Sequence, residues 1–125
     1  MYADKYYCSP PRRMTESEIA IVRALVQRAR PETWEVLCIG LEERLVRTLN
    51  DGGMGSFGFC GLGRFGEVAI EVGAKDVDGK GLLIGLNLDE TGQLFEIDVQ
   101  NPEAPLVRWP SVEDLDWDPY KRAPT

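Results

Sequence analysis

The segment EVAIEVGAKDVDGKGLLIGLNLDETGQLFEIDV, residues 67–99, contains three runs in which apolar residues occupy every second position. A period of two is typical of strands that bury one face. Asp78-Gly79 and Thr91-Gly92 separate the runs and suit hairpin turns. The apolar positions are Val68, Ile70, Val72 and Ala74, then Leu82, Ile84, Leu86 and Leu88, then Phe95, Ile97 and Val99. The segment therefore predicts an antiparallel meander with one apolar face.

The other face of this predicted sheet is polar and mostly acidic. Its residues are Glu67, Glu71, Asn87, Asp89, Glu96, Asp98 and Gln100. The formal net charge of the chain is −7, and residues 1–62 are balanced, with eight Lys/Arg and eight Asp/Glu. Residues 63–125 contain six Lys/Arg against thirteen Asp/Glu. Such a surface repels nucleic acids and anionic membranes and attracts basic partners, although an acidic half also serves solubility.

A helix is predicted to begin after Thr15. Thr15-x-x-Glu18 matches a capping box, and Met14 can contact Ile19 one turn into the helix. Apolar residues at helical spacing follow, and Pro31 limits the helix. The apolar stripe consists of Ile19, Ile21, Val22, Leu25, Val26 and Ala29.

The remaining segments complete a two-layer domain. Pro31 suits the first position of a short second helix that ends at Leu37 or Cys38. The segment from Leu45 to Asn50 precedes a run of glycines and predicts a strand entering a hairpin. The apolar stripe of the first helix and the apolar face of the sheet can cover each other. We therefore expect an α+β fold, with the N-terminal helix and the short second helix packed on one face of an antiparallel sheet.

Length and cysteine content indicate a single intracellular domain. The 125 residues are expected to form one domain, with an irregular N-terminal segment (1–13) and an irregular acidic C-terminal segment (111–125). Cys8, Cys38 and Cys60 cannot all pair and read as reduced thiols. The N-terminus lacks the apolar region of a signal peptide, and no run is long enough to span a membrane. We expect a cytoplasmic protein.

Seven of the thirteen glycines lie between Gly52 and Gly66, and they form G-x-G-x-x-G twice. A phosphate-binding loop of this pattern opens a helix or leads to a strand that carries a lysine. Here the loop leads directly into a predicted strand, and Glu71 stands where a kinase-type strand carries lysine. We therefore interpret the glycines as turn and bulge positions. The structural turn is assigned to Asp51, Gly52, Gly53 and Gly55.

The sequence shows no catalytic constellation. The chain has no histidine, so acid–base chemistry would fall to carboxylates, lysine, tyrosine or cysteine. Asp76 and Asp78 flank a turn near Asp89 and Glu90, but the distal glutamate of a calcium loop is missing. We predict no catalytic residue, no metal and no cofactor. The alternatives are a subunit of a larger assembly, or a small enzyme or ligand-binding domain that uses residues 52–66 and nearby carboxylates.

Two motifs carry a family resemblance: DGGMGS at residues 51–56 and NLDETGQLFEIDV at residues 87–99, together with Pro105-Leu106. With these motifs the chain resembles a family of small, functionally uncharacterised bacterial proteins, some of which are regarded as immunity proteins encoded beside polymorphic toxins. That family usually has Trp-Lys after the acidic strand, where this chain has Gln100-Asn101. The resemblance implies a shared fold and, as its function, inhibition of a toxin. For a cytoplasmic protein the toxin would act in the cytosol.

The acidic surface is the predicted interface with such a toxin. Carboxylates on a rigid sheet can occupy a basic active site, and aromatic residues ringed by charge are typical of binding hot spots. We expect a basic protein partner, no nucleic acid and no membrane. For Trp109, we favour a role in capping the core of the domain. The predicted partner-binding residues are Glu71, Asp89, Glu96 and Asp98 of the sheet, and Glu113, Asp114, Asp116, Trp117, Asp118 and Tyr120 of the C-terminal segment.

Overall fold

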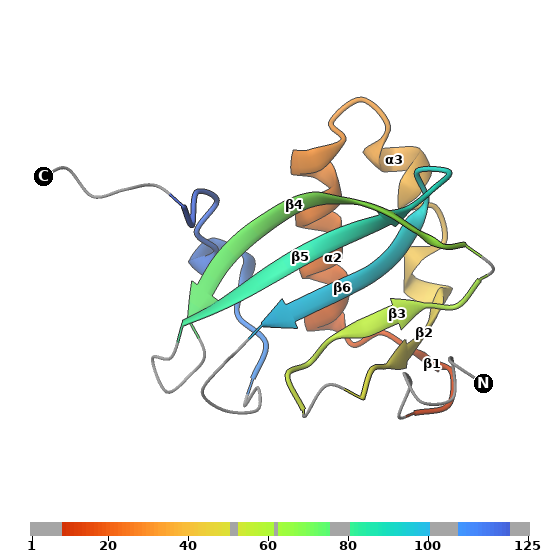
Figure 1. Cartoon of the computed structure of the whole chain (residues 1–125), viewed down its shortest axis with the longest axis horizontal. Coiled ribbons are helices and arrows are strands. Elements are labelled where there is room, and N and C mark those ends of the chain that lie inside the picture. Colours follow the sequence, from red (N-terminus) through yellow and green to blue (C-terminus); the bar gives the residue numbers. More distant parts are fainter. Residues whose placement is uncertain (1–8, 51–52, 62, 76–80, 101–107, 121–125) are drawn as a thin grey trace, which may run out of the picture.

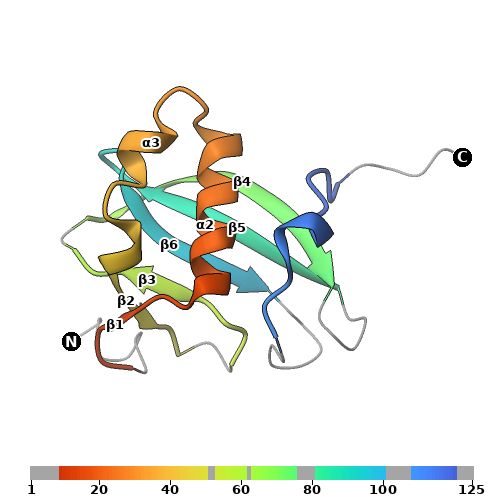
Figure 2. The same cartoon turned by 180° about the vertical axis from the view of Figure 1, so that it is seen from behind.

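The computed structural model describes residues 9–50, 53–61, 63–75, 81–100 and 108–120. In these residues six strands form one antiparallel sheet in the order β1-β2-β3-β6-β5-β4, and helix α2 lies across one face (Figure 1 and Figure 2). The predicted α+β fold is confirmed. The elements are β1 (Arg12–Arg13), α2 (Glu16–Ala29), α3 (Trp34–Leu37), the 3-10 helix η1 (Leu41–Glu43), β2 (Leu45–Thr48), β3 (Phe57–Phe59), β4 (Phe65–Lys75), β5 (Gly81–Asp89), β6 (Leu94–Gln100) and the 3-10 helix η2 (Val112–Asp114).

Helix α2 begins as its capping box predicts. The Thr15 hydroxyl accepts a hydrogen bond from the Glu18 N–H at 3.1 Å, and the Glu18 carboxylate accepts one from the Thr15 N–H at 2.8 Å. These bonds satisfy amide groups that the first helical turn leaves without intrahelical partners. The second helix differs from the prediction, because residues 31–33 form a turn and α3 begins only at Trp34. Pro31 therefore precedes α3 instead of opening it.

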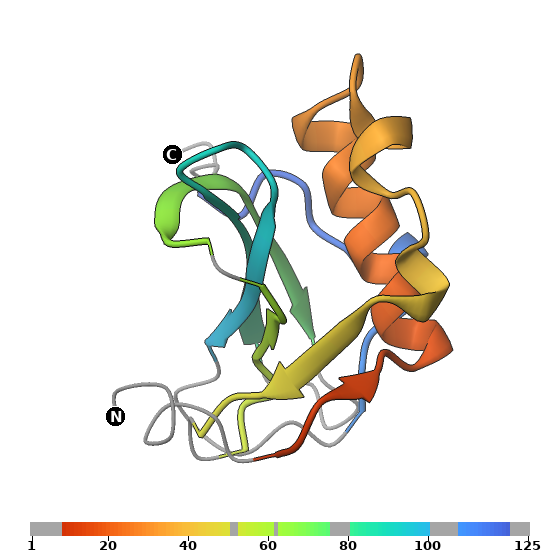
Figure 3. The ribbon, with the colours of Figure 1, turned by 90° about the vertical axis from the view of Figure 1, so that its right-hand side faces the viewer.

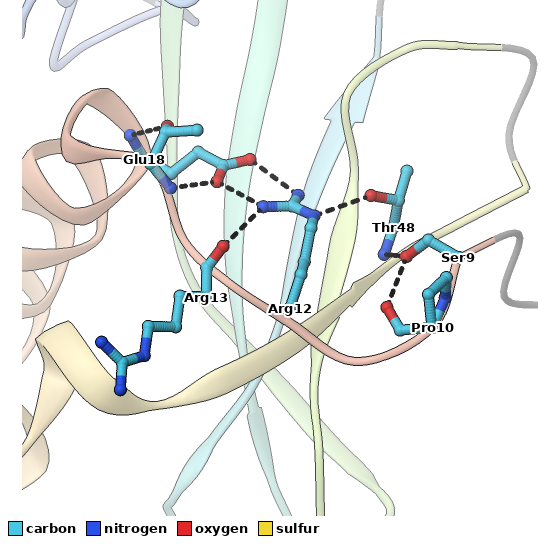
Figure 4. Close-up of polar contacts among 7 residues, drawn as sticks. Ser9, Pro10, Arg12, Arg13, Glu18 and Thr48 are labelled. Atoms are coloured by element: carbon cyan, nitrogen blue, oxygen red, sulfur yellow. Dashed lines mark hydrogen bonds and ion pairs between the residues drawn. The ribbon is translucent and has the colours of Figure 1, made fainter.

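The N-terminal edge of the sheet is held to α2 by an ion pair (Figure 4). The Arg12 guanidinium donates to both carboxylate oxygens of Glu18, at 2.8 and 3.0 Å, and its Nε donates to the Thr48 hydroxyl at 3.1 Å. Glu18 is only 4% exposed. The same carboxylate therefore caps the helix and binds the arginine of β1, which ties the first strand to the start of the helix.

Helix α2 and the sheet form two layers in the side view (Figure 3), and the hydrophobic core lies between them. Strand β3 inserts between β2 and β6, with Phe57 paired to Ile97 and Gly58 to Glu96. The predicted meander is therefore only half of the sheet, and β6 is an interior strand. The largest fully buried side chains are Phe57, Ile21, Leu25, Leu41, Ile84, Leu86, Leu88, Ile97, Val22, Val26, Val46 and Val72.

Two bulges in β4 overturn part of the predicted face assignment. Phe65 pairs with Asp89 and Glu67 with Leu88, and Val68 pairs with Asn87 and Ile70 with Leu86, so Gly66 and Ala69 are extra residues in this strand. Each extra residue reverses the alternation of faces. Val68 consequently joins the outer face and is 51% exposed. The assignment of Val68 to the apolar face was therefore wrong.

The same bulges place Glu67 on the helix side. Glu67 lies opposite the buried Leu88 and accepts a hydrogen bond from Arg30, at the C-terminal end of α2. Its assignment to the outer acidic face was therefore wrong.

A third bulge lies in β6. Asn87 pairs with Glu96 and Leu88 with Leu94, so Phe95 is the extra residue. Leu94 is 3% exposed and takes the core position that the sequence pattern gave to Phe95, which is half-buried. The hairpin turn predicted at Thr91-Gly92 is present, with a φ of 85° at the glycine. The turn predicted at Asp78-Gly79 lies outside the described residues.

Residues 108–120, which we call the tail, pack on the domain. Leu115 is 8% exposed within the core, and the Trp109 ring meets the Phe57 ring edge-on at 5.9 Å. Asp116 forms a β-bridge with Gly73, exchanging two backbone hydrogen bonds of 2.8 Å. The prediction that Trp109 caps the core is confirmed. No helix in the described ranges is long and apolar enough to cross a membrane.

Candidate functional site

The outer face of β4, β5 and β6 lies opposite α2, and the described helices all sit on the other side (Figure 3). Glu71, Gly85 and Asp98 are aligned across the three strands. We call these three residues the acidic row. Because Gly85 has no side chain, the Glu71 side chain lies over it, and a Cβ there would lie 3.6 Å from Glu71 Cγ and 3.9 Å from Glu71 Oε2. Both carboxylates are half-buried and remain accessible.

Tyr120 of the tail joins one end of the acidic row. Its hydroxyl donates a hydrogen bond of 2.6 Å to Glu71 Oε1, and this bond to a carboxylate raises the pKa of Tyr120 above its usual value. Tyr120 is 66% exposed. The structure thus brings together Glu71, Asp98 and Tyr120, three of the predicted interface residues that are distant in sequence.

Glu96 was predicted to be an accessible interface residue, but the structure buries it. It is 8% exposed, and its Oε1 accepts a hydrogen bond of 2.8 Å from Asn87 Nδ2. It lies between β5 and β3, opposite Asn87 on one side and Gly58 on the other. The sequence pattern could not reveal this burial, because the pairing of β3 with β6 joins segments that are far apart in the chain.

Asp89 stabilises the β5–β6 turn. Its Oδ1 accepts hydrogen bonds from the Thr91 N–H at 2.8 Å, the Thr91 hydroxyl at 2.6 Å and the Gln93 N–H at 3.0 Å. Partial burial opposes the charged form, but these hydrogen bonds outweigh it and lower the pKa of Asp89. Its side chain therefore has a structural role at the hairpin end, apart from the acidic row.

The second G-x-G-x-x-G pattern packs against this same turn. A Cβ on Gly66 would lie 2.4 Å from the Asp89 carbonyl oxygen, and one on Gly63 would lie 2.3 Å from the Asp89 carboxylate. The Glu90 N–H donates to the Arg64 carbonyl at 2.9 Å. These two glycines permit close approach of two backbone segments.

The first part of the glycine stretch contains the predicted turn. Gly53 and Gly55 have φ values of 84° and 103°, in the region that favours glycine. They precede β3, as the turn assignment requires. The other two residues assigned to this turn, Asp51 and Gly52, lie outside the described residues.

The acidic residues of the tail are dispersed along it. Glu113 and Asp114 are exposed in η2, and Asp116 accepts a hydrogen bond of 3.0 Å from the Asp118 N–H through Oδ1. The half-buried Trp117 lies beneath the Arg28 guanidinium, 5.0 Å from ring centroid to Cζ, and packs against the core. Trp117 therefore contributes to the internal packing of the domain.

An apolar patch beside the acidic row was not predicted. Phe65 and Val68 are 53% and 51% exposed on the outermost strand, and the Phe65 ring meets the Phe95 ring edge-on at 6.3 Å. We call Phe65, Val68 and Phe95 the Phe65 patch. The only sequence signal for it was the small residues Gly66 and Ala69, which make bulges possible but do not specify them. Exposed apolar residues grouped in this way mark interaction surfaces.

Two further hollows have mixed linings. An open pocket of about 1130 Å³ lies between the tail and the ends of β4 and β5, with Lys75, Arg108 and Asp114 in its wall. A pocket of about 210 Å³ beside the glycine stretch includes Arg44 and Asp89. Neither lining favours one ligand charge. Within the described ranges, no group of three or more His, Cys, Asp or Glu side chains is arranged to hold a metal ion.

Comparison with known proteins gives a family match. A family model described as a domain of unknown function (DUF6984) matches residues 11–110, which include all six strands, the acidic row and the Phe65 patch. No curated protein and no solved structure matches the chain.

Proposed function

The chain belongs to the DUF6984 family, and we propose that it is an immunity protein that binds and neutralises a cognate bacterial toxin in the cytosol. The acidic row is the observation that carries the proposal. Glu71 and Asp98 are held on a rigid antiparallel sheet, on the face that the described helices leave uncovered. The family resemblance of the 51–56 and 87–99 motifs points in the same direction.

The charge of this surface favours a basic protein as the partner. The net charge of −7 and the two carboxylates of the acidic row give the surface a negative charge, which attracts a basic active site and speeds its association. The Phe65 patch adds the apolar contact area that a carboxylate surface lacks. Charge for steering and apolar side chains for burial are the combination that stable protein interfaces use.

Co-expression tests inhibition directly. The protein encoded by the gene adjacent to this one is taken as the candidate toxin and expressed in a bacterial host with and without the chain, and growth is measured. We expect growth rescue and a stable complex on size-exclusion chromatography. Absence of both rescue and complex would contradict the proposal.

A charge-reversal pair tests whether the acidic row carries recognition. Glu71→Lys with Asp98→Lys should slow association with the toxin by at least about tenfold at low salt, because steering depends on the sign of the surface charge. The matched control is Glu32→Lys with Glu35→Lys, exposed residues near α3 that give the same change in net charge. Equal association rates for the two double variants would place the interface elsewhere.

A further inference from the structure

Solvent exposure changes sharply along β4, which is the edge strand of the sheet next to β5. Its first four residues, 65–68, are exposed, whereas Val72, Gly73 and Ala74 are buried. Val72 and Ala74 are buried in the core, whereas Gly73 is covered by the tail, since Asp116 pairs with it and Pro119 lies 3.3 Å from where a Cβ on Gly73 would be. The strand therefore has a covered half and an open half.

The tail does not continue its pairing toward the open half. The Asp118 N–H donates to the Asp116 side chain, and Pro119 has no N–H to donate. Glu71 lies two residues before Gly73, so its backbone N–H and C=O point in the same direction, away from β5. In the described part of the chain, these groups have no strand beside them.

The open half also carries the Phe65 patch. Natural proteins usually protect an edge strand with charged residues, proline, a bulge or a covering segment, and β4 has a covering segment at Gly73 and bulges at Gly66 and Ala69. Beside these features, the edge presents two large apolar side chains between Phe65 and Val68 that are more than half exposed. An unpaired strand with exposed apolar residues fits the addition of a strand from another protein.

We propose that Phe65–Glu71 is a docking edge, on which an extended cationic segment of the protein partner adds as a further β-strand. This inference rests on the proposed function and specifies how the partner binds. Backbone hydrogen bonds to β4 supply affinity, the Phe65 patch accepts apolar side chains, and the acidic row selects lysine or arginine. A second copy of this chain fits poorly, because it would bring the same carboxylates and a further charge of −7.

The test uses a short capped peptide of alternating lysine and valine as the probe, titrated to millimolar concentration into the isotope-labelled protein and followed by NMR. We expect the largest amide shifts in Phe65–Glu71, together with slower hydrogen exchange there. The same peptide with all of its amides N-methylated keeps the charge and loses every backbone donor. We expect it to bind at least about tenfold more weakly if strand addition is the mode.

Matched variants distinguish peptide binding at the docking edge from nonspecific hydrophobic binding elsewhere on the surface. Phe65→Ser with Val68→Ser should weaken the peptide at least about tenfold. Val36→Ser with Ile39→Ser should leave binding unchanged, because these residues are 68% and 76% exposed in and beside α3. The inference fails if the peptide does not shift Phe65–Glu71, if N-methylation has no effect, or if the free protein self-associates through this edge.

The same variants distinguish this inference from the proposed function. The toxin could bind the Phe65→Ser, Val68→Ser variant as tightly as the wild type but fail to bind the Glu71→Lys, Asp98→Lys variant. In that case the immunity function stands and the docking edge is wrong. If the toxin binds neither variant nor the wild type, the proposed function is wrong, and the peptide titration still decides whether the edge accepts a strand.

Discussion

The two edges of the sheet are completed in different ways. At β1, Arg12 is bound by Glu18, which is nearly buried and belongs to the capping box of α2. At β4, the tail covers one half of the strand, and the other half exposes Phe65 and Val68. The acidic residue at the first edge is committed to the fold, whereas Glu71 at the second edge remains accessible. The contrast suggests that one edge maintains the domain and the other is available for a partner.

A substitution that breaks the contact between β1 and α2 should have the largest effect on stability. Glu18→Ala removes the ion pair between Arg12 and Glu18 and one half of the capping box. Because the Arg12 side chain is 31% exposed, we expect a loss of about 2–4 kcal/mol in the free energy of unfolding, somewhat less than for a fully buried pair. Urea denaturation measures it. Glu16→Ala, at an exposed position in the same helical turn, should change stability by less than about 0.5 kcal/mol.

A substitution that detaches the tail from β4 should have the second largest effect on stability. Leu115→Ala removes a core side chain that anchors the tail, with an expected loss of about 2–3 kcal/mol. Hydrogen exchange at Gly73 and Asp116 should accelerate as the tail detaches, because these two N–H groups form the β-bridge. Tyr120→Phe removes only the exposed hydrogen bond to Glu71 and serves as the control. Unchanged exchange in the Leu115 variant would show that the tail does not protect this edge.

A methyl group at the bulge should have a smaller effect. Gly66→Ala places a Cβ 2.4 Å from the Asp89 carbonyl oxygen, so one of the two backbones must shift. We expect a loss of about 1–3 kcal/mol, measured by thermal or urea unfolding. Gly61→Ala is the matched control, because nothing lies within 4 Å of its Cβ position. Equal stability of the two variants would mean that the close contact at Gly66 is easily relieved.

The pH response of Asp89 should be the smallest effect. Its folded-state pKa is lowered, so its charged form contributes stability that is present above the unfolded-state pKa and is lost as pH falls through the folded value. Asp89→Asn should therefore reduce stability at neutral pH and flatten the acid side of the stability curve. A variant whose curve keeps the wild-type slope below about pH 4 would contradict this assignment.

Much of the fold follows from short-range patterns. The capping box at Thr15 and the hairpin turn at Thr91-Gly92 were predictable, because each depends on residues within a few positions. Of the predicted site, Glu71, Asp98 and Tyr120 come together, whereas Glu96 is buried and Asp89 stabilises a turn. Alternation alone could not separate these roles, because all four carboxylates occupy equivalent positions in the pattern.

Local sequence was enough for the meander and its acidic outer face, since a period of two follows directly from strand geometry. Long-range pairing controlled the rest. The insertion of β3 beside β6 buries Glu96, the bulges at Gly66 and Ala69 turn Val68 outward, and the tail covers Gly73 but stops before Glu71. The position of a bulge and the choice of neighbouring strand depend on how distant segments fit together. The alternation within a single strand therefore cannot predict them.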